Sequence, residues 1–367
     1  MDRRKFLHTL SCLGATTALP AMALAGTASS AALSMGTTQF VAPENLLEIA
    51  DDPLAPRIGV VAIGGAGGSV LSSLLGKLPY LNCSIAIDVD PFALHGVAAV
   101  RKVLIGNGIT RPDDARSAKL LAIDAKSEIA EAVVDLDIAF VVAGMGGAAG
   151  TGIAPVIAAI LHEKKIISFG AAITPFDFEG RRRQQIALAG THALGRRVDA
   201  VFTIPNQVLA QASGMERSLS FPLDQATTTF ERLYRGVTLP FSESGLVNID
   251  TEGVRSILSK DRYSAIGYGN ARGENAAETA ALQAIAHPLL GERRLRSASG
   301  ILVSIEGAPG ALQRLGQVNK ILNTVRNTIG DADHEQILCC GANRNTALAD
   351  EFRVTILASG ILAEENA

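Results

Sequence analysis

Two glycine-rich runs are the residues of this sequence best suited to chemistry. Residues 64–69 (GGAGGS) follow the apolar run 57–63, and residues 144–152 (GMGGAAGTG) follow the apolar run 136–142. Helical spacing of apolar residues resumes after each. A glycine-rich turn at a helix start exposes backbone N–H groups with no Cβ atoms in the way, so a phosphate can approach closely. Two such turns at one edge of a parallel sheet predict a nucleotide site.

The elements that must position these runs alternate between strands and helices. Residues 83–87 form a further apolar strand pattern, and a helical pattern at 279–286 precedes another strand pattern at 300–305. This alternation predicts an α/β fold with a parallel sheet. A length of 367 residues corresponds to about two domains.

Composition and charge exclude several classes of protein. With 48% hydrophobic and 19% charged residues the chain is not disordered. A net charge of −3 without long basic runs disfavours nucleic-acid binding. The six histidines and four cysteines lack metal-ligand spacing, and no G-x-S-x-G or H-E-x-x-H motif supplies a hydrolase or protease site.

The N-terminus resembles a twin-arginine export signal over residues 1–25. Arg3 and Arg4 precede Phe6-Leu7 and a modest apolar stretch, which ends in the small-residue triplet 23–25 (ALA). An ordinary basic N-terminus before an Ala-rich helix is the alternative. Residues 26–55 are small, polar and interrupted by proline, which is typical of a linker. No run of 18 uncharged apolar residues follows, so no spanning helix is predicted.

The second glycine run, with Ala154-Pro155-Val156 after it, resembles the tubulin signature of the bacterial division GTPase FtsZ. Further stretches resemble FtsZ in the same order along the chain: 174–183 (TPFDFEGRRR), 204–206 (IPN), 245–250 (GLVNID), 267–276, 287–290 (HPLL) and 353–360. The resemblance covers about residues 57–361. It implies a Rossmann-like parallel-sheet GTPase domain at 56–235 that includes a central helix, and a second α/β domain, the activation domain, at 236–367. It also implies GTP or GDP as ligand, and Mg²⁺ as an accompanying ion.

The resemblance assigns nucleotide contacts position by position. The first phosphate loop is matched by Gly64, Gly65, Gly67, Gly68 and Ser69, and the signature loop by Gly146, Gly147, Gly150, Thr151 and Gly152. Glu179 and Arg183 match ribose and phosphate contacts, Asn206 matches a guanine-side asparagine, and Thr227 falls at the central-helix position facing the base.

Several of these positions depart from the family pattern. Ala66 adds a Cβ to the first loop, and Ala148 and Ala149 replace a glycine and a threonine of the signature. Thr227 stands where the family presents Asp or Asn, and threonine cannot offer the paired acceptors that select guanine. The family loop that senses the γ-phosphate is replaced by residues 112–116 (PDDAR), whose two carboxylates repel a triphosphate unless they turn outward or Mg²⁺ bridges them.

The hydrolytic loop also departs from the family. FtsZ uses N-x-D-x-x-D, inserted from the next subunit, and this chain has 248–253 (NIDTEG). Asp250 and Glu252 are the candidate catalytic residues, but Gly253 replaces the second aspartate. Capping of the helix that follows is sufficient to explain Asp250. The sequence therefore predicts weak or absent GTP hydrolysis.

Two functions remain open. In the first, the chain is a divergent FtsZ-like GTP-binding protein that self-associates head to tail in cell division or membrane remodelling, with itself and a division FtsZ as partners. In the second, it is a non-enzymatic scaffold with a decayed nucleotide site, exported to the periplasm. The first requires a cytoplasmic, membrane-associated location, which we favour. Only seven residues follow Gly360, so we expect no adaptor recruitment through a C-terminal peptide.

Overall fold

The computed structural model describes residues 55–109, 112–212, 220–241, 245–258, 263–312, 315–330 and 336–361. The twin-arginine segment and all but the last residue of the expected linker lie outside these ranges. All of the described residues belong to one compact unit, residues 45–367. Within the described residues no helix is both long enough and apolar enough to cross a membrane.

One sheet of eleven strands runs through this unit. The strands are β1 (Ile58–Ile63), β2 (Leu81–Asp88), β3 (Arg101–Leu104), β4 (Ile138–Gly144), β5 (Ile167–Thr174), β6 (Ala200–Pro205), β7 (Gly245–Val247), β8 (Tyr263–Arg272), β9 (Gly300–Gly307), β10 (Ile337–Arg344) and β11 (Glu351–Ser359). Their order is β3-β2-β1-β4-β5-β6-β8-β11-β9-β10-β7.

The helices cover both faces of this sheet. They are α1 (Gly64–Leu74), α2 (Pro91–Gly96), α3 (Ala115–Asp124), α4 (Lys126–Ala132), α5 (Ala148–Glu163), α6 (Arg181–Gly195), α7 (Asn206–Ala212), α8 (Ser220–Thr238), α9 (Thr251–Ile257), α10 (Ala276–Ile285), α11 (Gly291–Ser297), α12 (Pro309–Leu312) and α13 (Leu315–Ile329). Two short 3-10 helices, η2 (Asp177–Glu179) and η3 (Leu239–Phe241), complete the described helices.

The first six strands form a parallel sheet in the order 3-2-1-4-5-6. Strands β1 and β4 are buried on both faces, which explains their continuous apolar runs. In β1, Val60 belongs to the same core cluster as Phe140 and Phe230, and Val61 belongs to a second cluster that contains Ile157. The predicted Rossmann-like parallel-sheet architecture is confirmed. The order reverses between β1 and β4, and in such sheets ligands bind at that point, beyond the carboxyl ends of the strands.

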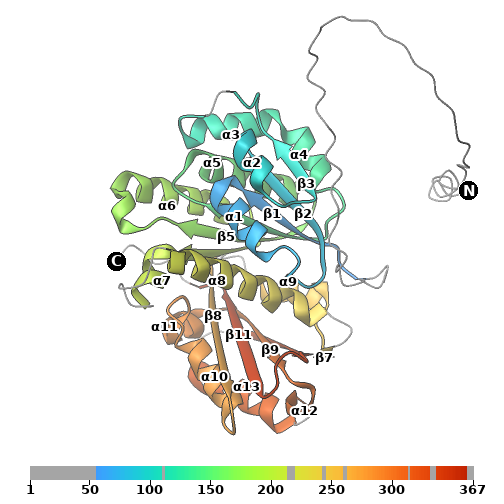
Figure 1. Cartoon of the computed structure of the whole chain (residues 1–367). Coiled ribbons are helices and arrows are strands. Elements are labelled where there is room, and N and C mark those ends of the chain that lie inside the picture. Colours follow the sequence, from blue (N-terminus) through green and yellow to red (C-terminus); the bar gives the residue numbers. More distant parts are fainter. Residues whose placement is uncertain are drawn as a thin grey trace, which may run out of the picture. The chain divides into compact units, whose positions relative to one another are not determined.

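The second half of the sheet is mixed. β8 and β11 are antiparallel, as are β11 and β9, whereas β9 and β10 are parallel. Helices α10 and α13 pack together over this half, and a third apolar core lies beneath them. Helix α8 runs between the two halves, where it contacts α1 and β6 on one side and β9 and β11 on the other (Figure 1). It occupies the place of the predicted central helix.

All of the first glycine run and the second half of the other are helical, which differs from the expectation that the helices start after the runs. Helix α1 begins at Gly64 itself, and α5 begins at Ala148 inside the second run. A left-handed residue precedes or opens each helix, since φ is +68° at Gly64 and +97° at Gly146. The chain therefore turns within one or two residues of the strand end, and the backbone N–H groups at the helix starts point outward.

Candidate functional site

Two of the four glycines in the first run are required by packing. A Cβ on Gly67 would lie 2.4 Å from the carbonyl oxygen of Val142, and a Cβ on Gly68 would lie 2.6 Å from Cγ2 of Val97. These glycines bring α1 close to β4 and to the chain after α2. Gly64 is required for its left-handed turn. Gly65 differs from all three, because a Cβ there would have no non-neighbouring atom of the described residues within 4 Å.

In the second run, too, packing requires some of the glycines and leaves another open. A Cβ on Gly150 would lie 2.1 Å from the carbonyl oxygen of Gly144, and a Cβ on Gly152 would lie 2.3 Å from that of Ala115. The N–H of Gly146 donates to Oγ1 of Thr151 at 2.9 Å, which closes the turn. Gly147, which precedes the first residue of α5, again has open space where a Cβ would stand.

The two runs lie against each other. A Cβ on Gly64 would be 3.5 Å from both the Cβ of Ala149 and the backbone nitrogen of Gly150. The methyl group of Ala66 lies 2.7 Å from where a Cβ of Gly144 would stand, so this methyl points at the second run. The departure from glycine at position 66 is therefore accommodated between the two runs.

Gly65 and Gly147 mark the open part of this arrangement. Neither has a left-handed φ, and neither touches a neighbour where a Cβ would stand, so neither conformation nor packing requires glycine there. Ser69 lies one turn after Gly65 and donates its hydroxyl to the Gly65 carbonyl at 2.9 Å. The result is a stretch of uncovered backbone next to the N-termini of two helices, which side chains at positions 65 and 147 would cover.

Glu179 and Arg183, predicted as nucleotide contacts, lie together beside the second run. Arg183 Nη1 is 3.0 Å from Glu179 Oε2, and the other Glu179 oxygen accepts the N–H of Phe176 at 2.8 Å. The Arg183 side chain also packs along Gly146, since its Cγ lies 2.7 Å from where a Cβ would be. About half of the Arg183 side chain is exposed, so the cation remains accessible at the edge of the glycine surface.

Asn206 and Thr227, predicted to face the base, lie on neighbouring helices. Asn206 opens α7 and is 6% exposed, and its side-chain oxygen has no hydrogen-bond partner among the described residues. A buried amide oxygen without a partner costs about 1–3 kcal/mol, which a ligand donor would recover. Thr227 on α8 donates its hydroxyl to the Leu223 carbonyl at 3.1 Å, so that hydrogen is already used within the helix. Helices α7 and α8 are packed together.

The segment that replaces the γ-phosphate loop lies close to the second run. Asp114 caps α3 by accepting the N–H of Ser117 at 2.8 Å. The backbone hydrogen bond from Ser117 lowers the pKa of this exposed carboxyl. Ala115, which follows it, packs against Gly152. The carboxylate thus stays ionised near the helix start, but it is turned into its own cap.

Asp250 and Glu252 lie near the amino ends of the parallel strands, whereas the glycine runs lie at the carboxyl ends. Asp250 caps α9 by accepting the N–H of Gly253 at 2.7 Å, which confirms the predicted cap, and Glu252 is exposed. Arg255 of the same helix donates to the Lys165 carbonyl, just before the start of β5. The strands that precede the glycine runs, β1 and β4, run in the same direction as β5, so the runs lie at the end of the sheet where β5 finishes. Since β5 has eight residues, about 23 Å of strand separates the two edges. One chain cannot bring the two groups together.

The sequence interpretation missed a buried ion pair between α8 and the second half of the sheet. Arg235 donates through Nε and Nη2 to Glu306 on β9. The two residues are 71 positions apart and belong to no motif, so no local pattern indicates the pair. The Arg181 and Arg182 side chains are exposed. No cluster of three or more His, Cys, Asp or Glu side chains able to hold a metal lies in the described ranges.

Comparison with protein families gives two matches. Residues 57–214 match the GTPase domain of the tubulin/FtsZ family, and residues 263–362 match the C-terminal domain of the FtsZ family.

Individual relatives agree with these matches. The chain is 34% identical over 333 residues to the cell division protein FtsZ of a Wolbachia species, covering 85% of this chain and 81% of that protein. It is 31% identical to FtsZ of Azotobacter vinelandii, covering 86% and 80%. A solved FtsZ dimer of M. jannaschii, without nucleotide, superposes with a TM-score of 0.75 at 25% identity, covering 84% of this chain and 89% of that one. CetZ2 of Haloferax volcanii, a GTPγS-bound protofilament, shares the fold at 21% identity with a TM-score of 0.70, covering 84% and 94%.

Proposed function

The chain belongs to the tubulin/FtsZ family, and on that premise we propose that it binds a guanine nucleotide and self-associates head to tail. The printed names of its relatives support a role in cell division, and membrane remodelling is the related role that we also propose.

The open glycine surface at Gly65 and Gly147 carries this proposal. Neither conformation nor packing requires glycine at these two positions, which is also true of Gly316 on α13. What distinguishes Gly65 and Gly147 is their place, because both lie at helix starts just beyond strand ends, where a phosphate can approach the backbone only if no Cβ occupies the place of its oxygens. The surface also lies beyond β1 and β4, where the strand order reverses.

The remaining residues fit a nucleotide whose phosphates lie on that surface. The N–H groups at the starts of α1 and α5 would hold the phosphates, and Arg183 would add a cation. The unpartnered oxygen of Asn206 would accept a base N–H. A Mg²⁺ ion, which in such sites is held largely by phosphate oxygens and water, would offset the charge of nearby Asp114.

Head-to-tail association follows from where the two sets of residues lie. The nucleotide surface and the Asp250 loop occupy opposite edges of the parallel sheet, so only a second copy can bring one to the other. A heterologous contact of this kind repeats along a line. The solved dimer of the M. jannaschii protein and the protofilament of the Haloferax protein support this arrangement for the present chain.

Hydrolysis is expected to be weak. Asp250 is engaged as a helix cap, and Gly253 lacks the second carboxylate of the family motif. A carboxylate held in position to orient the attacking water raises the rate of such a reaction greatly. The loss of one therefore slows turnover by orders of magnitude.

Replacing Gly253 with aspartate tests this explanation. A Cβ at Gly253 would lie 2.6 Å from Cγ2 of Ile249, so the Ile249 side chain must move aside. We expect Ile249→Ala/Gly253→Asp to raise polymer-dependent GTP hydrolysis above that of Ile249→Ala alone, measured as phosphate release against protein concentration. If the double variant turns over no faster while still pelleting with GTP, loss of the second carboxylate is not what slows the reaction.

The proposed function itself is tested by the nucleotide content of the purified full chain. Denaturation and ion-exchange chromatography should release GDP or GTP, and sedimentation velocity should show larger species with GTP than without nucleotide. A nucleotide-free protein that remains monomeric with GTP favours the alternative, a non-enzymatic scaffold. The engaged hydroxyl of Thr227 and the alanines at 148 and 149 support that alternative.

Location separates the two functions independently. A GTP-binding chain must act in the cytoplasm, where GTP is supplied, and membrane association there would come through residues 1–25. Export would follow if those residues act as a twin-arginine signal. Cell fractionation, with the N-terminal sequence of the mature chain determined, distinguishes the two locations.

A further inference from the structure

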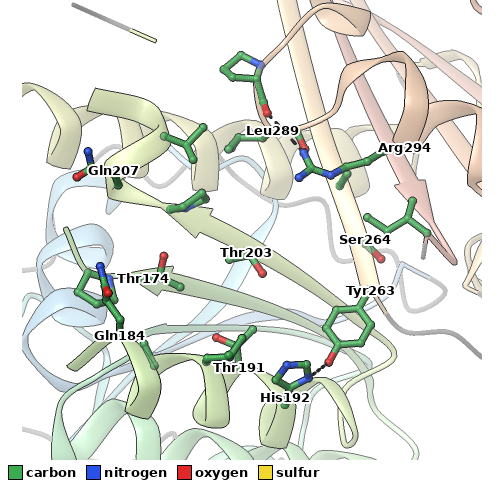
Figure 2. Close-up of a pocket in the computed structure, with 18 of the residues that line it drawn as sticks. Thr174, Gln184, Thr191, His192, Thr203, Gln207, Tyr263, Ser264, Leu289 and Arg294 are labelled. Carbon is green, nitrogen blue, oxygen red and sulfur yellow. Dashed lines mark hydrogen bonds between the residues drawn. The ribbon is translucent and has the colours of Figure 1, made fainter. Parts of the chain in front are cut away.

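A cavity of about 480 Å³ lies on the face of the sheet covered by α6, away from the glycine surface. Helices α6 and α7 and strand β6 form one side, and residues of the second half of the chain form the other (Figure 2). In Figure 2, Gln184 and Gln207 lie at one end, and Tyr263 and Arg294 lie at the other. The volume is in the range of pockets that hold small organic molecules.

Thr191 on α6 supplies a buried hydroxyl to this cavity. The residue is 5% exposed, and its Oγ1 has no hydrogen-bond partner within the described part of the chain. Four other helical threonines donate to the carbonyl one turn before them: Thr227, Thr229, Thr324 and Thr328. Thr191 makes no such bond, although the Ala187 carbonyl stands at the same spacing. Its hydroxyl is thus a buried polar group that a molecule in the cavity would satisfy.

The rest of the lining is apolar in the middle and polar at the ends. Ala187, Val208 and Leu289 contribute apolar surface, and Leu188, which is 46% exposed, forms part of the rim. The Arg294 guanidinium donates to the Leu289 carbonyl at 3.2 Å and places a cation in the wall.

The acid at the other end is already engaged. The Asp177 carboxylate accepts from Gln184 at 2.8 Å, and the Asp177 N–H donates to Gln207 at 3.2 Å. The Asp177 end carries a negative charge and the Arg294 end a positive one, so the Arg294 end favours an anionic group.

We propose that this cavity binds a small amphipathic carboxylate, with its apolar body against Val208 and Leu289, its charge toward Arg294 and a polar atom on Thr191. The site is separate from the nucleotide surface, because the cavity lining contains no residue of the two glycine runs and neither Arg183 nor Asn206. A hydrogen bond between Tyr263 and His192 joins β8 to α6 at the cavity wall. A bound molecule would contact both halves of the chain.

Calorimetry of the full chain with naphthoate, an aromatic carboxylate, tests the proposal. We expect saturable binding of one naphthoate per chain, tighter than that of neutral naphthylmethanol, and unchanged by saturating GDP. Thr191→Val keeps the shape of the side chain but removes the hydroxyl, and should weaken binding about threefold to tenfold. Thr203→Phe places an aromatic ring in the cavity from an exposed strand position, and should abolish binding.

Thr324→Val is the matched control, because it removes a hydroxyl from α13, outside the cavity. It should bind naphthoate as the unmodified chain does. Equal affinity of the unmodified chain, Thr191→Val and Thr203→Phe would overturn the proposal, as would displacement of naphthoate by GDP or a failure of naphthoate to bind. Should Thr203→Phe fail to fold, Thr191→Val against Thr324→Val decides the matter.

Discussion

Replacing Gly65 with valine is expected to weaken nucleotide binding at least about a hundredfold while leaving the fold intact. The valine side chain would stand in the open surface that the phosphates require, and about two charge-assisted hydrogen bonds would be lost, each worth about 1.5–3 kcal/mol. The free chain should be no less stable, because glycine near a helix start costs up to about 1 kcal/mol relative to better helix formers. Binding is measured by calorimetry with GDP, and stability by urea unfolding of the nucleotide-free chain.

Gly316 supplies a matched control for this substitution. It is the second residue of α13, as Gly65 is of α1, and a Cβ there also meets no non-neighbouring atom of the described residues within 4 Å. Gly316→Val should therefore change neither nucleotide affinity nor stability appreciably. Equal GDP affinities for Gly65→Val and Gly316→Val would show that the open glycine surface does not hold the phosphates.

Replacing Glu306 with glutamine is expected to lower the free energy of unfolding by about 3–5 kcal/mol. Glu306 is 4% exposed and accepts from Arg235 and, at 2.9 Å, from Asn345. Glutamine has nearly the same shape, but it leaves the partly buried Arg235 cation without its counter-charge between α8 and β9. Urea unfolding at neutral pH measures the loss. Glu292→Gln is the control, since its pair with Arg296 is exposed and should contribute less than about 1 kcal/mol.

The effect of Glu306 should depend on pH. Burial raises the pKa of this carboxyl, but the hydrogen bond and charge of Arg235, with Asn345 and Arg232, outweigh burial and hold the pKa below its ordinary value of 4.5. A lowered pKa contributes stability that is complete above pH 4.5 and is lost as the pH falls through the folded-state value. The stability difference between the unmodified chain and Glu306→Gln should be constant above pH 4.5 and shrink below it. A difference that stays constant into the acid range would show that the ion pair is not its source.

The strand and glycine pattern of the nucleotide half could be predicted because it is local. Apolar runs that are buried on both faces, each followed by glycines, define β1 with α1 and β4 with α5 without reference to the rest of the chain. The start of α1 at Gly64 could not be predicted, because a run of glycines has no periodicity that marks a helix. The contacts that α1 makes with β4 and Val97 determine where this helix starts.

The roles of individual site residues depend on distant neighbours and were only partly predictable. Gly65 and Gly67 are identical in the sequence, yet one faces open space and the other packs on Val142. Asp250 was predicted as a cap from its position before a helix, which is again local. The pair of Arg235 and Glu306, and the cavity at Thr191, join segments about 70 or more residues apart, and no spacing rule connects them.

Calorimetric titration of the full chain with GTP, GDP and ATP in the presence of Mg²⁺ tests the central claim most directly. The account predicts saturable binding of one guanine nucleotide per chain, with the Asn206 oxygen accepting a base N–H. Absence of heat and of any thermal stabilisation by all three nucleotides would contradict it, and would leave the glycine surface without the ligand that explains its shape.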